Sequence, residues 1–69
     1  MPFVNIRIVK EVIADDPTGK KASIAADVTT AIQKVTGLAE TDVWVVFEEV
    51  AAADWYVGKT SVEDRRAGR

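Results

Sequence analysis

The sequence predicts an α/β fold: a short βαβ unit with two parallel strands, followed by a C-terminal hairpin segment. An alternating apolar segment predicts a first strand over residues 3–9, and a continuous apolar run predicts a second over residues 43–50. Between them, residues 20–36 carry apolar side chains at helical spacing. Strand, helix and strand within about 45 residues form one right-handed crossover. The 69 residues therefore make one domain, residues 1–69, with a polar tail at 60–69.

The first strand is predicted to have two different faces. Val4, Ile6 and Ile8 fall on one face, whereas the other holds a mixture of apolar and polar side chains. The loop that follows, KEVIADDPT over residues 10–18, has no strand pattern. The first strand is therefore expected to end at about residue 9.

Helix start and stop signals surround the central segment. Asp16 followed by Pro17 is typical of an N-cap and first helical position, and Gly37 stands where helices end on a left-handed glycine. Gly19 weakens the first turn relative to alanine. The predicted apolar stripe consists of Ile24, Val28, Ala31, Ile32 and Val35.

The second strand begins with the five apolar residues VWVVF, which predicts burial on both faces. Trp44 and Phe47 lie on opposite faces of this strand. Residues 51–59 hold two adjacent aromatics and a glycine, which indicates a turn and hairpin, and a helical turn is expected at 62–66. Two strands and one helix leave open sheet edges and one uncovered face, so the sheet must be completed by another copy.

Composition narrows the function classes. The chain has no cysteine and no histidine, which excludes thiolate metal sites, disulfides, and serine–histidine or cysteine–histidine catalysis. A carboxylate metal site at Asp15 and Asp16 is an alternative to their reading as a solvated helix cap, but we expect no metal. A 69-residue chain without staples, yet 48% hydrophobic, is expected to gain stability as a homo-oligomer.

The net charge and the hydropathy of the chain limit the kinds of partner that it can have. The net charge is −2, which argues against nucleic acid as a partner. No apolar run reaches membrane-spanning length, and no basic segment followed by a long apolar one resembles a signal peptide. We therefore expect no membrane partner and a cytoplasmic location.

One group stands out chemically once these classes are removed. Removal of Met1 would turn the Pro2 nitrogen from an amide into a free secondary amine, able to act as a base. Burial beside Phe3 and Val4 would lower the pKa of such an amine towards neutrality. The alternative interpretation is a proline that only begins a strand.

The sequence resembles the 4-oxalocrotonate tautomerase family over roughly residues 2–58. The resemblance is carried by the Met-Pro start, the strand PFVNIRIV, the lysine-bearing helix, and VWVVFEEV followed by DWYVG. It implies a cofactor-free isomerase whose amino-terminal proline, Pro2, moves a proton on an enol or 2-oxo carboxylate. It also implies short βαβ chains that assemble into dimers and then into a homohexamer.

Carried over by position, the resemblance assigns further substrate-binding residues. Trp55 matches the aromatic of the apolar pocket, and Val9 and Val57 match its walls. The family's carboxylate-binding arginines are missing, because the loop after the first strand has none and Trp44 stands at the second position. Lys10, which shares strand parity with Pro2, is our candidate to replace them.

Several alternatives stay open. Arg7 and Lys20 are other candidates for the clamp, and Tyr56 could donate a hydrogen bond to an enolate oxygen. Glu48 or Glu49 could act as a catalytic carboxylate. The same proline could serve a hydratase, dehalogenase or decarboxylase, or the chain could be a non-catalytic oligomeric homologue in which Trp44 only packs.

Overall fold

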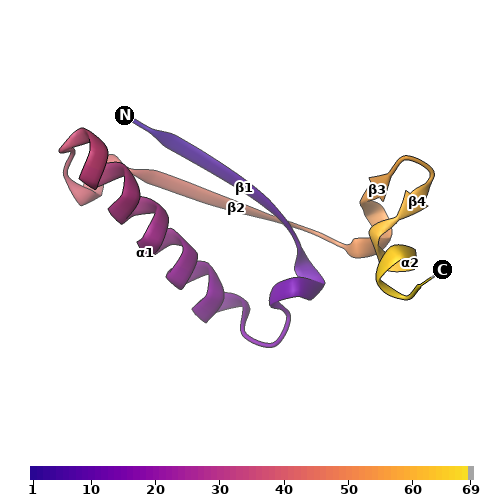
Figure 1. The fold of residues 1–69 in the computed structure, drawn as a ribbon. Coiled ribbons are helices and arrows are strands. Elements are labelled where there is room, and N and C mark those ends of the chain that lie inside the picture. The colour runs from indigo at the N-terminus through magenta and orange to yellow at the C-terminus, as the bar shows by residue number, and fades with distance from the viewer. Residues whose placement is uncertain (69) are drawn as a thin grey trace.

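A computed structural model describes residues 1–68 of the chain, and its elements confirm the predicted βαβ unit. The first strand and the second strand run parallel, with one long helix between them in sequence and a small hairpin beyond the second strand (Figure 1). The elements are β1 (Phe3–Val9), α1 (Pro17–Thr36), β2 (Trp44–Val50), β3 (Tyr56–Val57), β4 (Thr60–Ser61) and α2 (Val62–Arg66), with 3-10 turns at Lys10–Ile13, Glu40–Asp42 and Ala52–Asp54.

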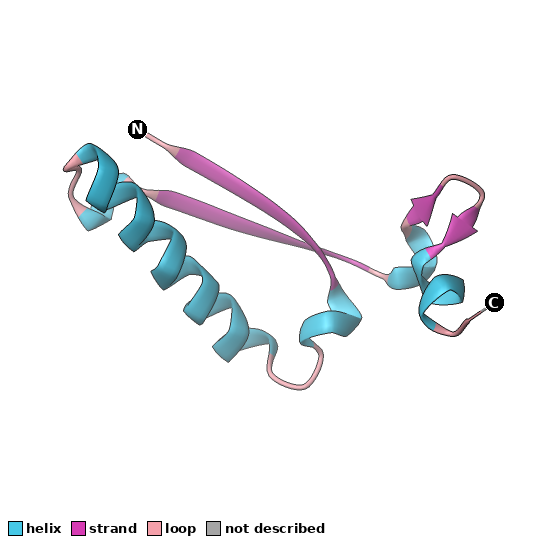
Figure 2. Ribbon diagram, in the orientation of Figure 1, coloured by secondary structure: helices cyan, strands magenta, loops and turns pink. Residues whose placement is uncertain are grey.

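The two long strands pair in a single register, from Phe3 opposite Trp44 to Val9 opposite Val50. Alternate residues therefore share a face across both strands. Helix α1 lies along one face, covering the half-buried side chains Val4, Ile6, Ile8, Val45 and Phe47. The other face carries no helix in the described chain (Figure 2).

Helix α1 begins and ends as its sequence signals predict. The Asp16 carboxylate accepts a hydrogen bond from the Gly19 amide at 3.1 Å, and Pro17 occupies the first helical position. Gly37 ends the helix with φ 76°, a left-handed conformation that glycine adopts without steric cost. A methyl group at position 19 would collide with the Asp16 carboxylate, so Gly19 leaves room for the cap that starts the helix.

Two of the five residues predicted to form the buried apolar stripe of the helix are exposed. Ile24, Val28 and Ile32 face the sheet, but Ala31 is exposed and Val35 is 86% exposed. A helix of 20 residues is about 30 Å long, whereas seven-residue strands reach about 23 Å. The last turn, which holds Val35, therefore extends beyond the sheet that would cover it.

Element bounds differ modestly from those predicted. The helix starts at Pro17 and not at residue 20, because the cap and proline signal sets the first turn. The predicted loop over residues 10–18 contains the 3-10 turn Lys10–Ile13, and β2 starts one residue later than predicted. Part of the predicted polar tail is ordered structure, because β4 and α2 lie within residues 60–66, and Arg69 lies outside the described residues.

The C-terminal hairpin is confirmed and has a small core of its own. Tyr56 pairs with Ser61 and Val57 with Thr60, in antiparallel order. The 3-10 turn before it packs on α2, and the Ser61 hydroxyl caps that helix by accepting from the Asp64 amide at 3.1 Å. The buried residues among 1–68 are Ile13, Ala52 and Ser61.

The open face of the sheet shows that the chain alone is not compact. Phe3 is 61% exposed and Trp44 is 55% exposed, so the predicted burial of VWVVF on both faces is wrong within one chain. The radius of gyration is 15.0 Å, compared with about 11 Å for a compact chain of this length. The hairpin extends from the end of β2 away from α1 (Figure 1). No helix within residues 1–68 is long and apolar enough to cross a bilayer.

Replacement of the helix cap tests this description of α1. Asp16→Ala removes the side-chain acceptor for the Gly19 amide and is expected to lower the free energy of unfolding by about 1 kcal/mol. Asp27→Ala, an exposed site within the same helix, is the matched control and should cost nothing. Urea unfolding at one fixed protein concentration measures both, and equal destabilisation by the two variants would contradict the capping role.

Candidate functional site

Pro2 lies immediately before β1, at the amino end of the sheet (Figure 1). Its carbonyl oxygen accepts a hydrogen bond from the Trp44 amide at 3.1 Å, which extends the strand pairing back to the proline. The proline is half-buried, whereas Met1 is 78% exposed. The strand pairing therefore fixes the carbonyl of Pro2. The nitrogen of Pro2 is bonded to Met1, which is exposed.

The other predicted binding residues lie at the opposite end of the sheet. Val9 ends β1, and Lys10 begins the 3-10 turn, so strand parity does not extend to Lys10. Trp55 is half-buried and Val57 is 52% exposed, both in the hairpin region that follows β2. Seven residues of strand separate Pro2 from Val9, a distance of about 23 Å. Within one chain, Pro2 and Trp44 therefore lie at the amino end of the sheet, and Val9, Lys10, Trp55 and Val57 lie at or beyond its other end.

A hollow of about 330 Å³ lies at this second end, which we call the Arg7 hollow. It is formed where the open face of the sheet meets the start of the hairpin, and its lining residues are Arg7, Val50, Asp54, Trp55 and Tyr56. Trp55 was expected at a pocket, and Arg7 and Tyr56 were alternatives. Val50 and Asp54 were not predicted, although the parity of Val50 with Arg7 on the strands was visible in the sequence.

Charged side chains on the open face are linked. The Glu48 Oε1 atom accepts a hydrogen bond from Asn5 Nδ2 at 2.7 Å and lies 3.6 Å from Arg7 Nε. The two side chains of the ion pair are 67% and 47% exposed. Such an exposed contact, beyond hydrogen-bond length, stabilises the fold little.

Other candidates from the sequence are already paired. The Glu49 carboxylate meets Lys21 Nζ at 2.5 Å on the helix face, away from the Arg7 hollow. Lys20 Nζ donates to Asp15 at 2.6 Å, which lowers the pKa of the Asp15 carboxyl. Within residues 1–68 no three acidic side chains gather as a metal site would require. Lys20 and Glu49 thus each form an ion pair outside the Arg7 hollow.

Glu11 is a structural residue that sequence reasoning missed. Its Oε1 atom accepts a hydrogen bond from the Ala52 amide at 2.9 Å, which joins the turn after β1 to the turn after β2. That hydrogen bond is the main reason that the pKa of Glu11 lies below its ordinary value, and the positive charges of Lys10 and Arg66 act in the same direction. Glu11 therefore fixes the segment that carries Trp55 relative to the sheet.

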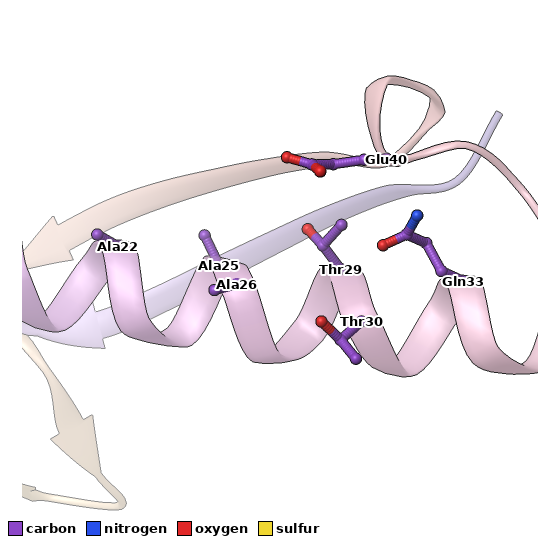
Figure 3. A pocket seen from close by; sticks show the side chains of 7 residues that line it. All are labelled: Ala22, Ala25, Ala26, Thr29, Thr30, Gln33 and Glu40. Atoms are coloured by element: carbon purple, nitrogen blue, oxygen red, sulfur yellow. The ribbon is translucent and has the colours of Figure 1, made fainter.

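A second hollow, of about 360 Å³, lies along α1. Figure 3 shows small side chains of the helix lining it, with Glu40 from the turn before β2 above them. Its lining residues are Ala22, Ala25, Ala26, Thr29, Thr30, Gln33 and Glu40. Apart from Glu40 these side chains do not titrate, so the arrangement provides no acid–base pair.

Comparison with known proteins identifies relatives. A family described as tautomerase enzyme matches residues 2–65. A protein of Dickeya dadantii (strain 3937) named probable tautomerase K2 is 35% identical over 66 residues, which cover 96% of this chain and 94% of the relative. No solved structure matches this chain.

The pH dependence of the Glu11 contact provides a test. Because the folded pKa is depressed, the stabilisation is present above the unfolded pKa of about 4.3 and is lost as the pH falls through the folded pKa. Glu11→Ala should remove the exchange protection of the Ala52 amide at about pH 7, whereas Glu11→Gln keeps an acceptor and most of the protection.

Amide hydrogen exchange followed by NMR measures this protection, and Glu63→Ala, an exposed residue of α2, is the control. In the unaltered protein acidification should lower the protection only to the level of Glu11→Gln, because the protonated carboxyl is also a neutral acceptor. Protection of Ala52 that is equal in Glu11→Ala and Glu63→Ala would show that the hydrogen bond does not hold the turn.

Proposed function

Because the chain belongs to the tautomerase family, we propose that it is a cofactor-free isomerase acting on a small enol or 2-oxo carboxylate. Its general base is the amine of Pro2, exposed when Met1 is removed. The observation that best supports this is the setting of Pro2. Its carbonyl is tied to the Trp44 amide, while the bond to Met1 is at an exposed end.

The reaction is a proton transfer between two positions of the substrate. The neutral Pro2 amine takes the enol O–H proton, the electron pair moves to form the C=O bond, and the prolinium returns a proton to carbon. A base works best when its pKa lies near the operating pH. An ordinary α-amino group titrates near 8, and apolar surroundings lower this value, which Phe3 and Trp44 would provide once covered.

We further propose that the working form is a homo-oligomer, a hexamer built from dimers. The chain exposes 4962 Å², against about 4,200 Å² for a compact protein of its mass. The uncovered sheet face carries Phe3, Trp44 and Val46. A two-fold axis that pairs sheet edges in antiparallel fashion would bring the amino end of one strand beside the carboxyl end of its partner. Pro2 of one copy would then face Trp55, Val9, Val57 and Lys10 of another.

The residue beside Pro2 supports a second candidate within the same chemistry. Trp44, and not an arginine, is the neighbour of the proline, so a dicarboxylate finds no cation there. The same amine could then serve hydration, dehalogenation or decarboxylation of another substrate. A non-catalytic oligomer is the remaining alternative, and it requires nothing of the Pro2 amine.

Ketonisation of phenylenolpyruvate, followed by ultraviolet absorbance, tests the proposal. Two preparations of the chain are compared, one with Met1 removed and one with Met1 retained, and mass spectrometry first confirms the identity of each. The trimmed form should be active, and retention of Met1 should lower kcat by about 100-fold or more, because the nitrogen is then an amide. Pro2→Ala should lose a similar factor, since a primary amine lacks the ring that fixes the lone pair.

The two forms differ only at the proline nitrogen, so the comparison needs no other control. Equal rates with and without Met1 would exclude the amine as the base. If the trimmed protein has no ketonisation but hydrates a haloacrylate or decarboxylates a β-keto acid, the second candidate replaces the first.

Assembly through the open sheet face has its own test. Trp44→Glu puts a charge among the exposed apolar side chains of this face and should shift the assembled protein towards smaller species. Val35→Glu, at a residue that is 86% exposed on the overhanging helix turn, should leave the mass unchanged. Sedimentation equilibrium measures both, and an unchanged mass for Trp44→Glu would place the interface elsewhere.

A further inference from the structure

We propose that the open face of the sheet recognises a second copy of this chain through reciprocal ion pairs, in which Arg7 of each copy binds the partner's Glu48. This inference rests on the proposed homo-oligomer and deepens it, because it names the charges by which the face selects its partner. The position of the two charges, their contacts within the chain and the exposed area each support one part of it.

The open face carries one positive and one negative charge, side by side. Its rows are the register pairs Phe3–Trp44, Asn5–Val46, Arg7–Glu48 and Val9–Val50. Arg7 on β1 lies opposite Glu48 on β2, and the rows on either side hold no charged residue. Asp54 lines the hollow beside Arg7 but belongs to the turn after β2, beyond the last row. In a contact between identical surfaces, residue i of one copy meets residue j of the other and the reverse, so such a face is self-complementary.

Neither charge is fully satisfied within residues 1–68. Arg7 Nε lies 3.6 Å from Glu48 Oε1, and the same oxygen accepts a hydrogen bond from Asn5 Nδ2 at 2.7 Å. A separation of 3.6 Å makes an ion pair but not a hydrogen bond. The two side chains are 67% and 47% exposed, so both are open to water. A surface that covers this face removes that water, and each charge then needs a partner of opposite sign.

A second copy supplies both of the partners that the covered charges need. An uncharged surface would leave Arg7 and Glu48 buried with only their 3.6 Å contact, which disfavours binding. Another copy presents an acid to Arg7 and a cation to Glu48 at the same time. A planar guanidinium can bind both oxygens of one carboxylate through two N–H groups, which fixes the orientation of the copies. The face therefore selects a copy of itself over an uncharged surface.

The exposed area is large enough for such a contact. The chain exposes 4962 Å², about 750 Å² more than a compact protein of its mass. A standard interface buries about 800 Å² on each partner. Phe3, Trp44 and Val46 are exposed apolar side chains of the same face. The contact thus has an apolar part that provides affinity and a charged row that provides specificity.

Two charge reversals test the reciprocal pairs. Arg7→Glu leaves a face with two acids, and Glu48→Arg leaves a face with two cations. Each variant alone should raise the dissociation constant of the assembly by about 100-fold or more, because like charges then meet across the interface. An equal mixture of the two should regain the assembled mass in species that contain both variants, since an acidic face then meets a basic one. Sedimentation equilibrium measures the dissociation constants, and native mass spectrometry measures the composition.

Two further reversals are the matched control. Lys34→Glu and Asp27→Arg change the charge of the chain by the same amounts, at exposed sites of α1 away from the open face. Each should assemble alone as the unaltered protein does. The double variant that combines Arg7→Glu with Glu48→Arg should also assemble alone, because each copy again offers both charges. Its assembly shows that the strands tolerate the new side chains.

The reciprocal pairs are rejected if either single reversal assembles like the unaltered protein, or if the mixture regains no assembly. Rescue by the double variant without rescue by the mixture would mean that the charges pair only within one chain. A monomeric unaltered protein would overturn the proposed homo-oligomer and this inference together. An unaltered protein that assembles, with reversals that have no effect, would retain the oligomer and reject the pairs alone. Ketonisation by the trimmed protein tests the Pro2 amine separately.

Discussion

The uncovered face of the two-stranded sheet is the constraint on which the rest of this structure depends. One helix covers Val4, Ile6 and Phe47, and residues 1–68 contain no second element that covers Phe3 and Trp44. Apolar surface of this kind is stabilised only when it is removed from water, which is the reason for proposing that a further copy provides the contact. The same constraint bears on the site, because Pro2 and the Arg7 hollow lie at opposite ends of one sheet within the chain.

Local signals predicted the elements well where the residues themselves determine the conformation. Asp16 supplies an acceptor for a free amide, Pro17 has a fitting φ, and Gly37 tolerates a left-handed backbone, so each acts within one turn of its own position. Val35 was mispredicted because its exposure depends on a length difference between helix and strand, which no window of sequence contains. The turn Lys10–Ile13 was missed because it is fixed in part by the hydrogen bond from the Ala52 amide to Glu11, which lies 41 positions away in the sequence.

The site was less predictable than the fold for the same reason. Pro2 was predicted from its chemistry, and Trp55 from the family resemblance, but neither source gives a distance between them. Arg7 could be assigned to the open face by strand parity, whereas its proximity to Trp55 depends on how the chain turns after Val50. Glu11 gave no signal at all, since a carboxylate in a polar loop looks the same whether or not it binds a distant amide.

The Glu11–Ala52 hydrogen bond also has a consequence for the order of folding. It joins residues 41 positions apart, and closing a loop of that length in an unfolded chain is entropically costly. Once Val9 is paired with Val50, Glu11 and Ala52 each lie only two residues beyond that pair. The entropy cost of bringing them together is then small. The hairpin should therefore dock after the parallel sheet has formed, as the last step in the folding of the chain.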